Sequence, residues 1–329
     1  MVKLVIRVRR YKRSMYIIIA IIIVLVAAIM GGTIYFFNRA IVRSEKILDV
    51  TNLSEEEAEL WSEYIPLIND GKAWIKAQSL ERVEVKSRDG LKLVGHMLSA
   101  DEPKGTILMF HGYRSSGFQD FSCAAEYLYG LGYNLLIPDQ RAHGESEGKY
   151  IGYGVLERYD CVSWIEYINC RIGTDKPIVL DGISMGAATV LMAAGFKLPD
   201  NVRGIIADCG FTSPWDIFSH VLKNGFHIPT FPILYTGSIL SKIVAGFGFK
   251  DYSTLEALKN NRLPVLFVHG SKDNFVPSSM SEAAYEKAIA PKKLLIVPDA
   301  LHGNSYIKDT VCYKKELKDF FDKYIETAF

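Results

Sequence analysis

A serine flanked by two glycines is the position in this chain where residue types and spacing most directly suggest chemistry. Ser184 lies in the pattern Gly182-x-Ser184-x-Gly186, which is typical of a nucleophile elbow, a tight turn between a strand and a helix. The turn strains the serine backbone, so that its Oγ projects clear of both elements. Because the glycines have no Cβ, strand and helix can approach each other closely. Three fixed positions also arise by chance, so the surrounding residues have to supply the context.

The flanking sequence supplies the strand and the helix that this turn requires. From Gly105 onwards, apolar runs that predict buried strands alternate with helical patterns, and a hairpin with its turn at Asp89-Gly90 precedes them. Strands are expected at residues 82–86, 91–94, 106–110, 134–138, 178–180, 204–207, 265–268 and 294–297, and helices at 120–131, 155–170, 185–196, 279–289 and 310–326. The sequence thus predicts an α/β fold, with a mostly parallel sheet covered by helices on both faces.

The N-terminal part of the chain predicts a transmembrane anchor. Residues 16–37 are uncharged and rich in Ile and Val, and they are numerous enough to cross the roughly 30 Å hydrocarbon core of a bilayer. Six basic residues precede this run, whereas only Arg39 and Arg43 follow it before the first acidic residue. The positive-inside rule therefore predicts a cytoplasmic tail at 1–15 and a catalytic domain on the extracytoplasmic side of the cell membrane.

Two other interpretations of this apolar run are possible. A cleaved signal peptide is the alternative, but its apolar region usually has only about 7–15 residues and is followed by a small-x-small site. A buried core helix is disfavoured, because no polar face runs along residues 16–37.

Charge and cysteine usage argue against several classes of function. The whole chain has a net charge of +1, but beyond Arg43 it carries 30 basic residues against 37 acidic ones. An acidic remainder without a basic stripe argues against a nucleic-acid surface. The five cysteines form no CxxC or His-Cys cluster, and Cys161 and Cys170, about 13 Å apart on one predicted helix, are too distant to bridge. The sequence therefore predicts neither a metal site nor a cofactor.

Residues 38–79 are expected to form a helical connector between the anchor and the catalytic domain. Ser54 and Glu57 have the spacing of a capping box. Apolar residues then recur at helical spacing, at Leu60, Trp61, Tyr64, Ile65 and Ile68. We expect this apolar face to dock on the catalytic domain or on the membrane surface rather than to bind a ligand.

Four motifs, in a fixed order between residues 80 and 324, give the chain a resemblance to the α/β-hydrolase superfamily. They are His111-Gly112-Tyr113, the run from Asp139 to Ser146, the elbow, and the run from His269 to Asp273 followed by Leu301-His302-Gly303. Within the superfamily the chain looks most like membrane-anchored bacterial hydrolases of the esterase and serine-aminopeptidase-like group. This resemblance implies the α/β-hydrolase fold and a reaction that needs no metal or cofactor.

The order of catalytic residues in this superfamily, Ser then Asp or Glu then His, assigns partners to Ser184. Asp273 lies just past the strand expected at 265–268, and His302 is the only histidine that follows it. The imidazole would take the serine proton, and the carboxylate would fix the imidazole tautomer and stabilise the imidazolium. Asp208, at the end of the preceding strand, is the alternative acid.

Two backbone N–H groups are expected to form the oxyanion hole. One belongs to Met185, at the positive end of the helix that follows the serine, and the other to Tyr113, in the loop after the strand at 106–110. His111 is expected to fix this loop rather than to transfer protons. A polar cluster at the same sheet edge is expected to brace the loop, and it comprises Asp139, Arg141 and His143.

The segment at about residues 211–262 is longer than one crossover helix requires. It contains many large apolar side chains, among them Phe211, Trp215, Phe218, Phe226, Phe231, Tyr235, Ile239 and Phe247. Such a segment predicts a small helical cap above the serine, which supplies an apolar pocket for the acyl or alcohol part of a substrate.

These features predict a membrane-anchored serine hydrolase whose α/β-hydrolase domain covers residues 80–329. We expect it to cleave an acyl bond of a small-molecule substrate, a carboxylic ester, through an acyl-enzyme, and not to bind nucleic acid. A serine peptidase is the alternative, but only about 40 residues separate the anchor from the first strand. That length leaves no room for the N-terminal propeller of prolyl-oligopeptidase relatives. A catalytically inactive binding protein on the same fold is the third possibility.

Overall fold

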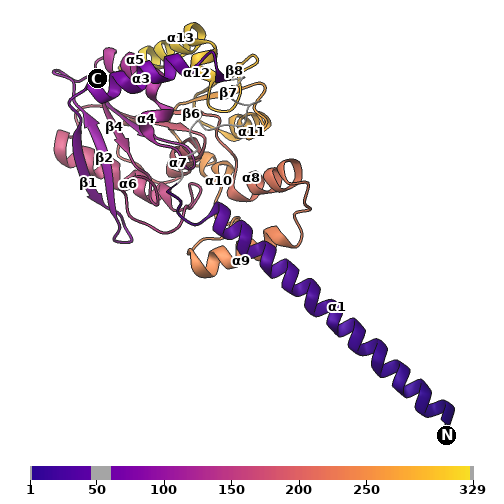
Figure 1. Ribbon diagram of the computed structural model, residues 1–329. Coiled ribbons are helices and arrows are strands. Elements are labelled where there is room, and N and C mark those ends of the chain that lie inside the picture. Colours follow the sequence, from indigo (N-terminus) through magenta and orange to yellow (C-terminus); the bar gives the residue numbers. More distant parts are fainter. Residues whose placement is uncertain (1, 46–60, 327–329) are drawn as a thin grey trace.

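The computed structural model describes the backbone of residues 2–45 and 61–326, with side chains from Lys12 onwards, and a mostly parallel sheet organises it (Figure 1). In this part of the chain the sheet has eight strands in the order β1-β2-β4-β3-β5-β6-β7-β8. They are β1 (Glu81–Lys86), β2 (Lys92–Leu98), β3 (Gly105–Phe110), β4 (Tyr133–Pro138), β5 (Ile178–Ile183), β6 (Val202–Asp208), β7 (Val265–Gly270) and β8 (Lys292–Val297). Only the pairs β1–β2 and β2–β4 are antiparallel, so β3 to β8 end at one common edge.

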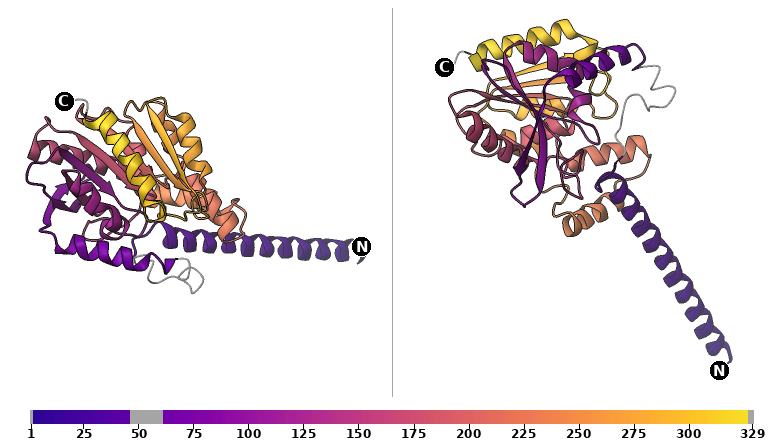
Figure 2. Two further views of the ribbon diagram at one scale, coloured as in Figure 1. Left: turned by 90° about the horizontal axis from the view of Figure 1, so that it is seen from above. Right: turned by 60° about the vertical axis from the view of Figure 1, so that its left-hand side comes forward.

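Helices cover both faces of this sheet, because its central strands are apolar on both sides (Figure 2). One face packs against α6 (Glu157–Ile172), α7 (Met185–Ala193), α10 (Thr254–Leu258) and α11 (Ser279–Lys287). The other face packs against α3 (Ile65–Ala77), α4 (Gly117–Asp120), α5 (Ser122–Gly130), α12 (Ser305–Lys308) and α13 (Thr310–Phe320), which continues as a π-helical turn to Ile325. Each layer has its own apolar core.

A third apolar cluster forms where the long N-terminal helix α1 (Val2–Ala40) meets the segment between β6 and β7. This segment contains α8 (Pro214–His220), a π-helical turn (Val221–Gly225) and α9 (Ile233–Val244), and the end of α1 packs along α9. The rest of α1 extends away from the body (Figure 1). Among the described residues, Lys12–Ala40 is the one helix long and apolar enough to span a membrane, as an anchor or a signal sequence.

The predicted fold class is confirmed, and the eight expected strands and five expected helices all occur, with ends shifted by a few residues. In the connector, α3 docks on α5, and its residue Ile75 joins the apolar core on that face, while Ile68 is also buried. The capping box at Ser54 and Glu57, with Leu60, lies outside the described residues. The domain limits at 15, 37 and 79 and those of the cap remain predictions.

Candidate active site

The elbow pattern folds as a sharp turn between β5 and α7. Ser184 has a φ of 56°, in the left-handed region that a non-glycine residue adopts only where its surroundings enforce it. A Cβ on Gly182 would lie 2.4 Å from the carbonyl carbon of Gly186, and one on Gly186 would lie 1.8 Å from the carbonyl oxygen of Phe110 in β3. Both positions therefore exclude any larger residue unless the backbone moves.

At the carboxyl edge of the sheet, His302 lies within hydrogen-bond distance of both Ser184 and Asp273. Nε2 of His302 is 2.9 Å from Oγ of Ser184, and Nδ1 of His302 is 2.6 Å from Oδ2 of Asp273. Ser184 follows β5, Asp273 follows β7, and His302 lies in the loop between β8 and α12. The parallel strands thus bring together a hydroxyl, an imidazole and a carboxylate, the three groups that a serine hydrolase would need as nucleophile, base and orienting acid.

The side chain of Asp273 is fully buried, and its oxygens are hydrogen bonded. Oδ1 accepts hydrogen bonds from the N–H groups of Phe275 at 2.9 Å and Val276 at 2.8 Å, and Oδ2 lies 3.2 Å from Nε2 of His269. Burial alone would raise the pKa of Asp273, but the imidazoles of His302 and His269 lower it below its usual range. The carboxylate is therefore ionised at neutral pH.

The imidazole of His302 is 26% exposed, so a substrate can reach it. Burial alone would lower the pKa of His302, but the Asp273 carboxylate raises it above its ordinary value. With the Nδ1 proton donated to Asp273, the neutral ring presents Nε2 as an acceptor to the hydroxyl of Ser184. The ring of Phe275 packs edge-on against the imidazole, with centroids 5.1 Å apart.

The alternative acid, Asp208, is engaged in other interactions. Its carboxylate accepts hydrogen bonds from the hydroxyls of Ser305 at 3.2 Å and Tyr313 at 3.1 Å. Burial raises the pKa of Asp208, which is the opposite direction from the shift of Asp273. Asp208 therefore ties α12 and α13 to the end of β6, whereas Asp273 faces the imidazole of His302.

The loop after β3 runs directly beside Ser184. A Cβ on Gly112 would lie only 3.4 Å from Cβ of Ser184, and the N–H of Gly112 donates to Oδ2 of Asp120 at 2.6 Å. The N–H of Tyr113 comes next on this loop, and that of Met185 opens α7. Within residues 2–45 and 61–326, neither of these two N–H groups has a hydrogen-bond acceptor. Both are thus available to an oxyanion.

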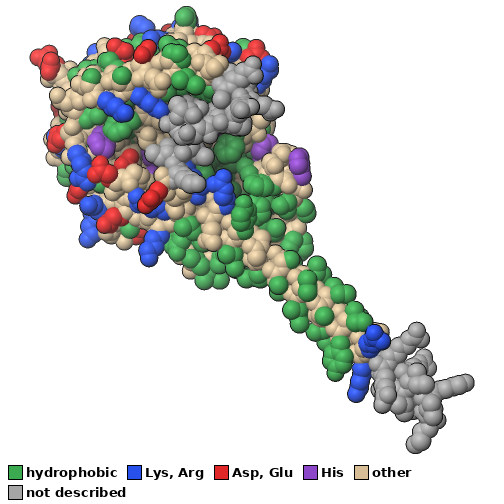
Figure 3. Space-filling view, in the orientation of Figure 1, with side chains coloured by type: hydrophobic (Ala, Val, Ile, Leu, Met, Phe, Trp, Pro, Cys, Tyr) green, Lys and Arg blue, Asp and Glu red, His purple; other side chains and the backbone are tan. Residues whose placement is uncertain are grey.

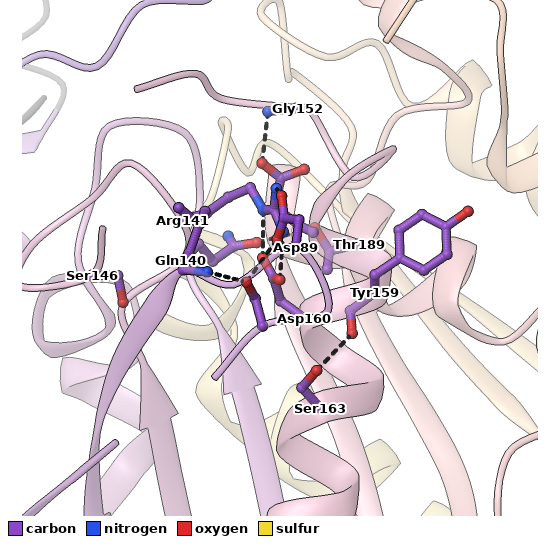
Figure 4. Close-up of polar contacts among 12 residues, drawn as sticks. Asp89, Gln140, Arg141, Ser146, Gly152, Tyr159, Asp160, Ser163 and Thr189 are labelled. Atoms are coloured by element: carbon purple, nitrogen blue, oxygen red, sulfur yellow. Dashed lines mark hydrogen bonds and ion pairs between the residues drawn. The ribbon is translucent and has the colours of Figure 1, made fainter. Parts of the chain in front are cut away.

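Gln140, whose side chain is drawn with that of Thr189 in Figure 4, links this loop to the elbow helix. Its side-chain amide donates to the carbonyl oxygen of His111, and its Oε1 accepts from the hydroxyl of Thr189 on α7 at 3.1 Å. The N–H of Gln140 donates to Nε2 of His111 at 3.1 Å. His111 is therefore buried within a network that fixes the loop, and it lies away from the path of the proton.

Arg141 and His143 brace the same edge from the side. The guanidinium of Arg141 binds Asp160 of α6 through two contacts of 2.6 Å and also binds Asp89 at 2.9 and 3.1 Å (Figure 4). Burial lowers the pKa of His143 to about 3, so its ring is neutral and Nε2 accepts the N–H of Arg114 at 3.0 Å. Arg141 thus ties this edge to α6, and His143 ties it to the loop after β3.

Two of these supporting residues, Asp120 and Gln140, have no predicted role in the sequence. Asp120 begins the helix expected at 120–131, where an acidic residue is ordinary. Gln140 lies in the motif from Asp139 to Ser146, where its charged and titratable neighbours are the more obvious candidates for a functional role. Sequence spacing alone does not show that either side chain turns back to the loop after β3.

An apolar pocket of about 370 Å³ opens beside Ser184. Its volume lies in the range of small-molecule sites. Three of the aromatic residues expected in the cap line it, namely Phe211, Phe218 and Phe226. The body contributes Tyr113 and Tyr153, and the opposite wall comes from the end of α1, which the sequence did not predict. The α1 residues that line the pocket are Thr33, Phe36, Phe37, Arg39 and Ala40, and Ile41 lines it directly after the helix.

One group of side chains near the serine has the composition of a metal site. Cys209, Asp273 and His302 place possible ligand atoms within 4.8 Å of one another. Burial raises the pKa of the Cys209 thiol well above its usual range, and Asp273 and His302 already bond to each other. These residues therefore fit a protonated thiol beside the hydrogen-bonded pair of Asp273 and His302 better than they fit a metal ion.

Comparisons with known proteins agree with this arrangement. A family model described as the alpha/beta hydrolase fold matches residues 105–229. The uncharacterized protein YqkD of Bacillus subtilis is 30% identical over 250 residues, which cover 74% of this chain and 82% of YqkD. An esterase of Pyrococcus furiosus has a TM-score of 0.65 at 20% identity, covering 87% of this chain and 98% of that chain. An acylaminoacyl peptidase of Pyrococcus horikoshii has a TM-score of 0.57 at 18% identity, and the match covers 77% of this chain and 43% of the peptidase chain. These two structures show the shared fold alone.

Proposed function

This chain belongs to the α/β-hydrolase superfamily and is a hydrolase of that fold, and we propose that it cleaves carboxylic esters through an acyl-enzyme on Ser184. The observation that carries the proposal is the pair of distances joining Ser184 to His302 and His302 to Asp273. The esterase activity named for the Pyrococcus furiosus neighbour supports the same class of reaction.

In the first step, Oγ of Ser184 attacks the carbonyl carbon of the ester while Nε2 of His302 takes the hydroxyl proton. The negative charge that develops on the carbonyl oxygen is stabilised by the N–H groups of Tyr113 and Met185. As the tetrahedral intermediate collapses, His302 returns the proton to the leaving alcohol. Water, deprotonated by the same imidazole, then attacks the acyl-enzyme and releases the carboxylic acid.

The composition of the pocket favours an ester over the free N-terminus of a peptide. Of the described residues that line it, none is acidic, and Arg39 is the one with a charged side chain. An aminopeptidase has to hold an ammonium group, for which a carboxylate is the natural partner. An apolar acyl group needs only the removal of its surface from water.

The experiment that tests the reaction class compares ester and amide substrates on the full-length chain in detergent micelles. We expect hydrolysis of p-nitrophenyl esters, with turnover of aminoacyl-anilides at least about a hundredfold slower. Faster cleavage of the anilides would assign the protein to the peptidases, and turnover of neither substrate would favour an inactive binding protein.

We also propose that residues 16–37 anchor the protein in the cell membrane, with the catalytic domain outside the cytoplasm. The excess of basic residues before Tyr16 supports this orientation. Protease added to intact cells should then remove the catalytic domain and leave residues 1–15 protected. A domain that becomes accessible only after lysis contradicts the orientation, and a shortened form released into the medium favours a cleaved signal.

A further inference from the structure

The pocket beside Ser184 is completed by the helix that has the length and composition of a membrane span. Phe37, on the last turn of α1, and Ile41, directly after the helix, are 7% and 0% exposed and belong to the same apolar cluster as the cap. Without these residues the pocket loses one wall. The candidate membrane span and the candidate acyl site are thus one structural unit.

Polar contacts hold the end of α1 in place against both the cap and the body. The hydroxyl oxygens of Thr33 and Thr236, on α1 and α9, lie 2.6 Å apart. The hydroxyl of Tyr113, in the loop after β3, donates to the carbonyl oxygen of Arg39 at 3.0 Å. The position of α1 relative to Ser184 is therefore fixed by both sides of the pocket.

The length of α1 places the pocket at the boundary of the hydrocarbon layer. If Lys12 and Arg13 lie at one membrane surface, the 20 residues from Arg13 to Thr33 span about 30 Å, which is the thickness of the hydrocarbon core. Thr33 then lies where the acyl chains end on the opposite side. The pocket begins at that depth and leads towards Ser184, on the body side of the boundary.

The neighbouring helix α9 presents a second apolar surface at the same level. Tyr235, Ile239 and Ile243, spaced four residues apart, form one face of α9, and they are 47%, 61% and 77% exposed. We call this the α9 face. Hydrophobic side chains continue from α1 onto the adjoining base of the body (Figure 3). An exposed apolar helix face beside a membrane span is typical of an interfacial helix.

We propose that the substrate is an acyl ester of a membrane lipid, which enters the pocket directly from the bilayer, at the depth of Thr33 and beside the α9 face. This rests on the ester hydrolysis proposed above. An acyl chain that slides from the bilayer into an apolar pocket exchanges one apolar environment for another, so it avoids the cost of crossing water. The ester group, at the boundary between acyl chains and head groups, follows the chain to Ser184.

The test uses the full-length chain in phosphatidylcholine vesicles that contain a fluorogenic diacyl phospholipid, with p-nitrophenyl butyrate added to the same sample. The variant Ile239→Asp/Ile243→Asp makes the α9 face polar without touching a pocket residue. We expect its hydrolysis of the vesicle lipid to fall at least about tenfold, because two large apolar side chains lose their membrane contact. Its butyrate hydrolysis and its labelling of Ser184 by a fluorophosphonate should stay within about twofold of the wild type.

The control is Val311→Asp, which places one aspartate on an exposed apolar position of α13, on the other side of the body from α1 (Figure 1). It should change neither rate. Wild-type protein that hydrolyses butyrate but not the vesicle lipid would overturn the inference, as would a double variant that loses no lipid activity. A double variant that changes only the oligomeric state would assign the α9 face to a second copy. Failure of butyrate hydrolysis in the wild type would instead contradict the proposed ester hydrolysis itself.

Discussion

The two sides of the pocket around Ser184 are built differently. On the body side, directional hydrogen bonds fix the functional groups, with His302 between Ser184 and Asp273 and with Gln140 holding the loop after β3. On the side of α1 and the cap, a few hydrogen bonds such as Thr33–Thr236 hold the helices, but the wall that faces the pocket consists largely of packed apolar side chains. Directional bonds position groups for charge transfer, whereas apolar packing selects by size and shape. We therefore expect changes on the first side to act on kcat and changes on the second to act on KM.

The largest effect among the residues around Ser184 is expected at Asp273. Asp273→Asn keeps the shape of the side chain but offers a donor where an acceptor is needed, and so it favours the wrong tautomer of His302. kcat should fall by up to about 10⁴-fold with little change in KM. The comparison variant is Asp208→Asn, for which kcat of the folded enzyme should stay within about tenfold of the wild-type value. If Asp208→Asn is the crippled enzyme instead, the acid has been assigned to the wrong strand.

Substitutions at Arg141 test the structural support of the site, because they should change the stability of the fold. Arg141→Met leaves the buried carboxylate of Asp160 without its cation, which should lower the free energy of unfolding by about 3–5 kcal/mol. The double variant Arg141→Met/Asp160→Leu should recover most of this loss, because neither charge then remains buried. Chemical denaturation of the full-length protein in detergent measures both values. An equal loss in the double variant would show that the cluster acts through more than this ion pair.

The pH dependence of kcat/KM should report the titration of His302. The Asp273 carboxylate stabilises the imidazolium and raises the pKa of His302, and only the neutral imidazole can accept the proton of Ser184. Activity should therefore rise with pH through a pKa above about 6.5 and fall about tenfold per unit below it. In Asp273→Asn the apparent pKa should move downward. A profile that Asp273→Asn leaves unshifted would contradict the coupling of the two groups.

The smallest effect is expected in the apolar wall. Phe226 lines the pocket and packs edge-on against Phe36 of α1, with ring centroids 5.0 Å apart. Phe226→Ala should raise KM for a long-chain ester by a few-fold to about tenfold, with a smaller change for an acetate ester. The control is Phe231→Ala, an exposed cap residue that does not line the pocket. A fall in kcat alone would show that this wall also positions the reacting groups.

The difference between the two sides of the pocket also explains which parts of the molecule the sequence could predict. The strands are continuous apolar runs and the elbow is a short local pattern, so both can be predicted from residues that are close together in the sequence. The order of Ser184, Asp273 and His302 follows from the family resemblance, and the structure brings these three residues together. The role of Asp273 rather than Asp208 remains a prediction, although the geometry favours it.

The contribution of α1 to the pocket could not be predicted in this way. Residues 16–37 are apolar throughout, and an unbroken apolar run does not distinguish a lipid-facing turn from one that packs on protein. At its end, Phe36 is only partly exposed and Phe37 is buried, because the cap packs against this turn. Contacts between segments nearly 200 residues apart in the sequence cannot be predicted from the spacing of residues within either segment.

The central claim, that Ser184 is the nucleophile, is tested most directly by locating the adduct of a fluorophosphonate probe on the full-length protein by mass spectrometry. We predict a single adduct on Ser184, together with loss of labelling and a fall in kcat of about 10⁶-fold in Ser184→Ala. Labelling or ester turnover that survives in Ser184→Ala would contradict the claim.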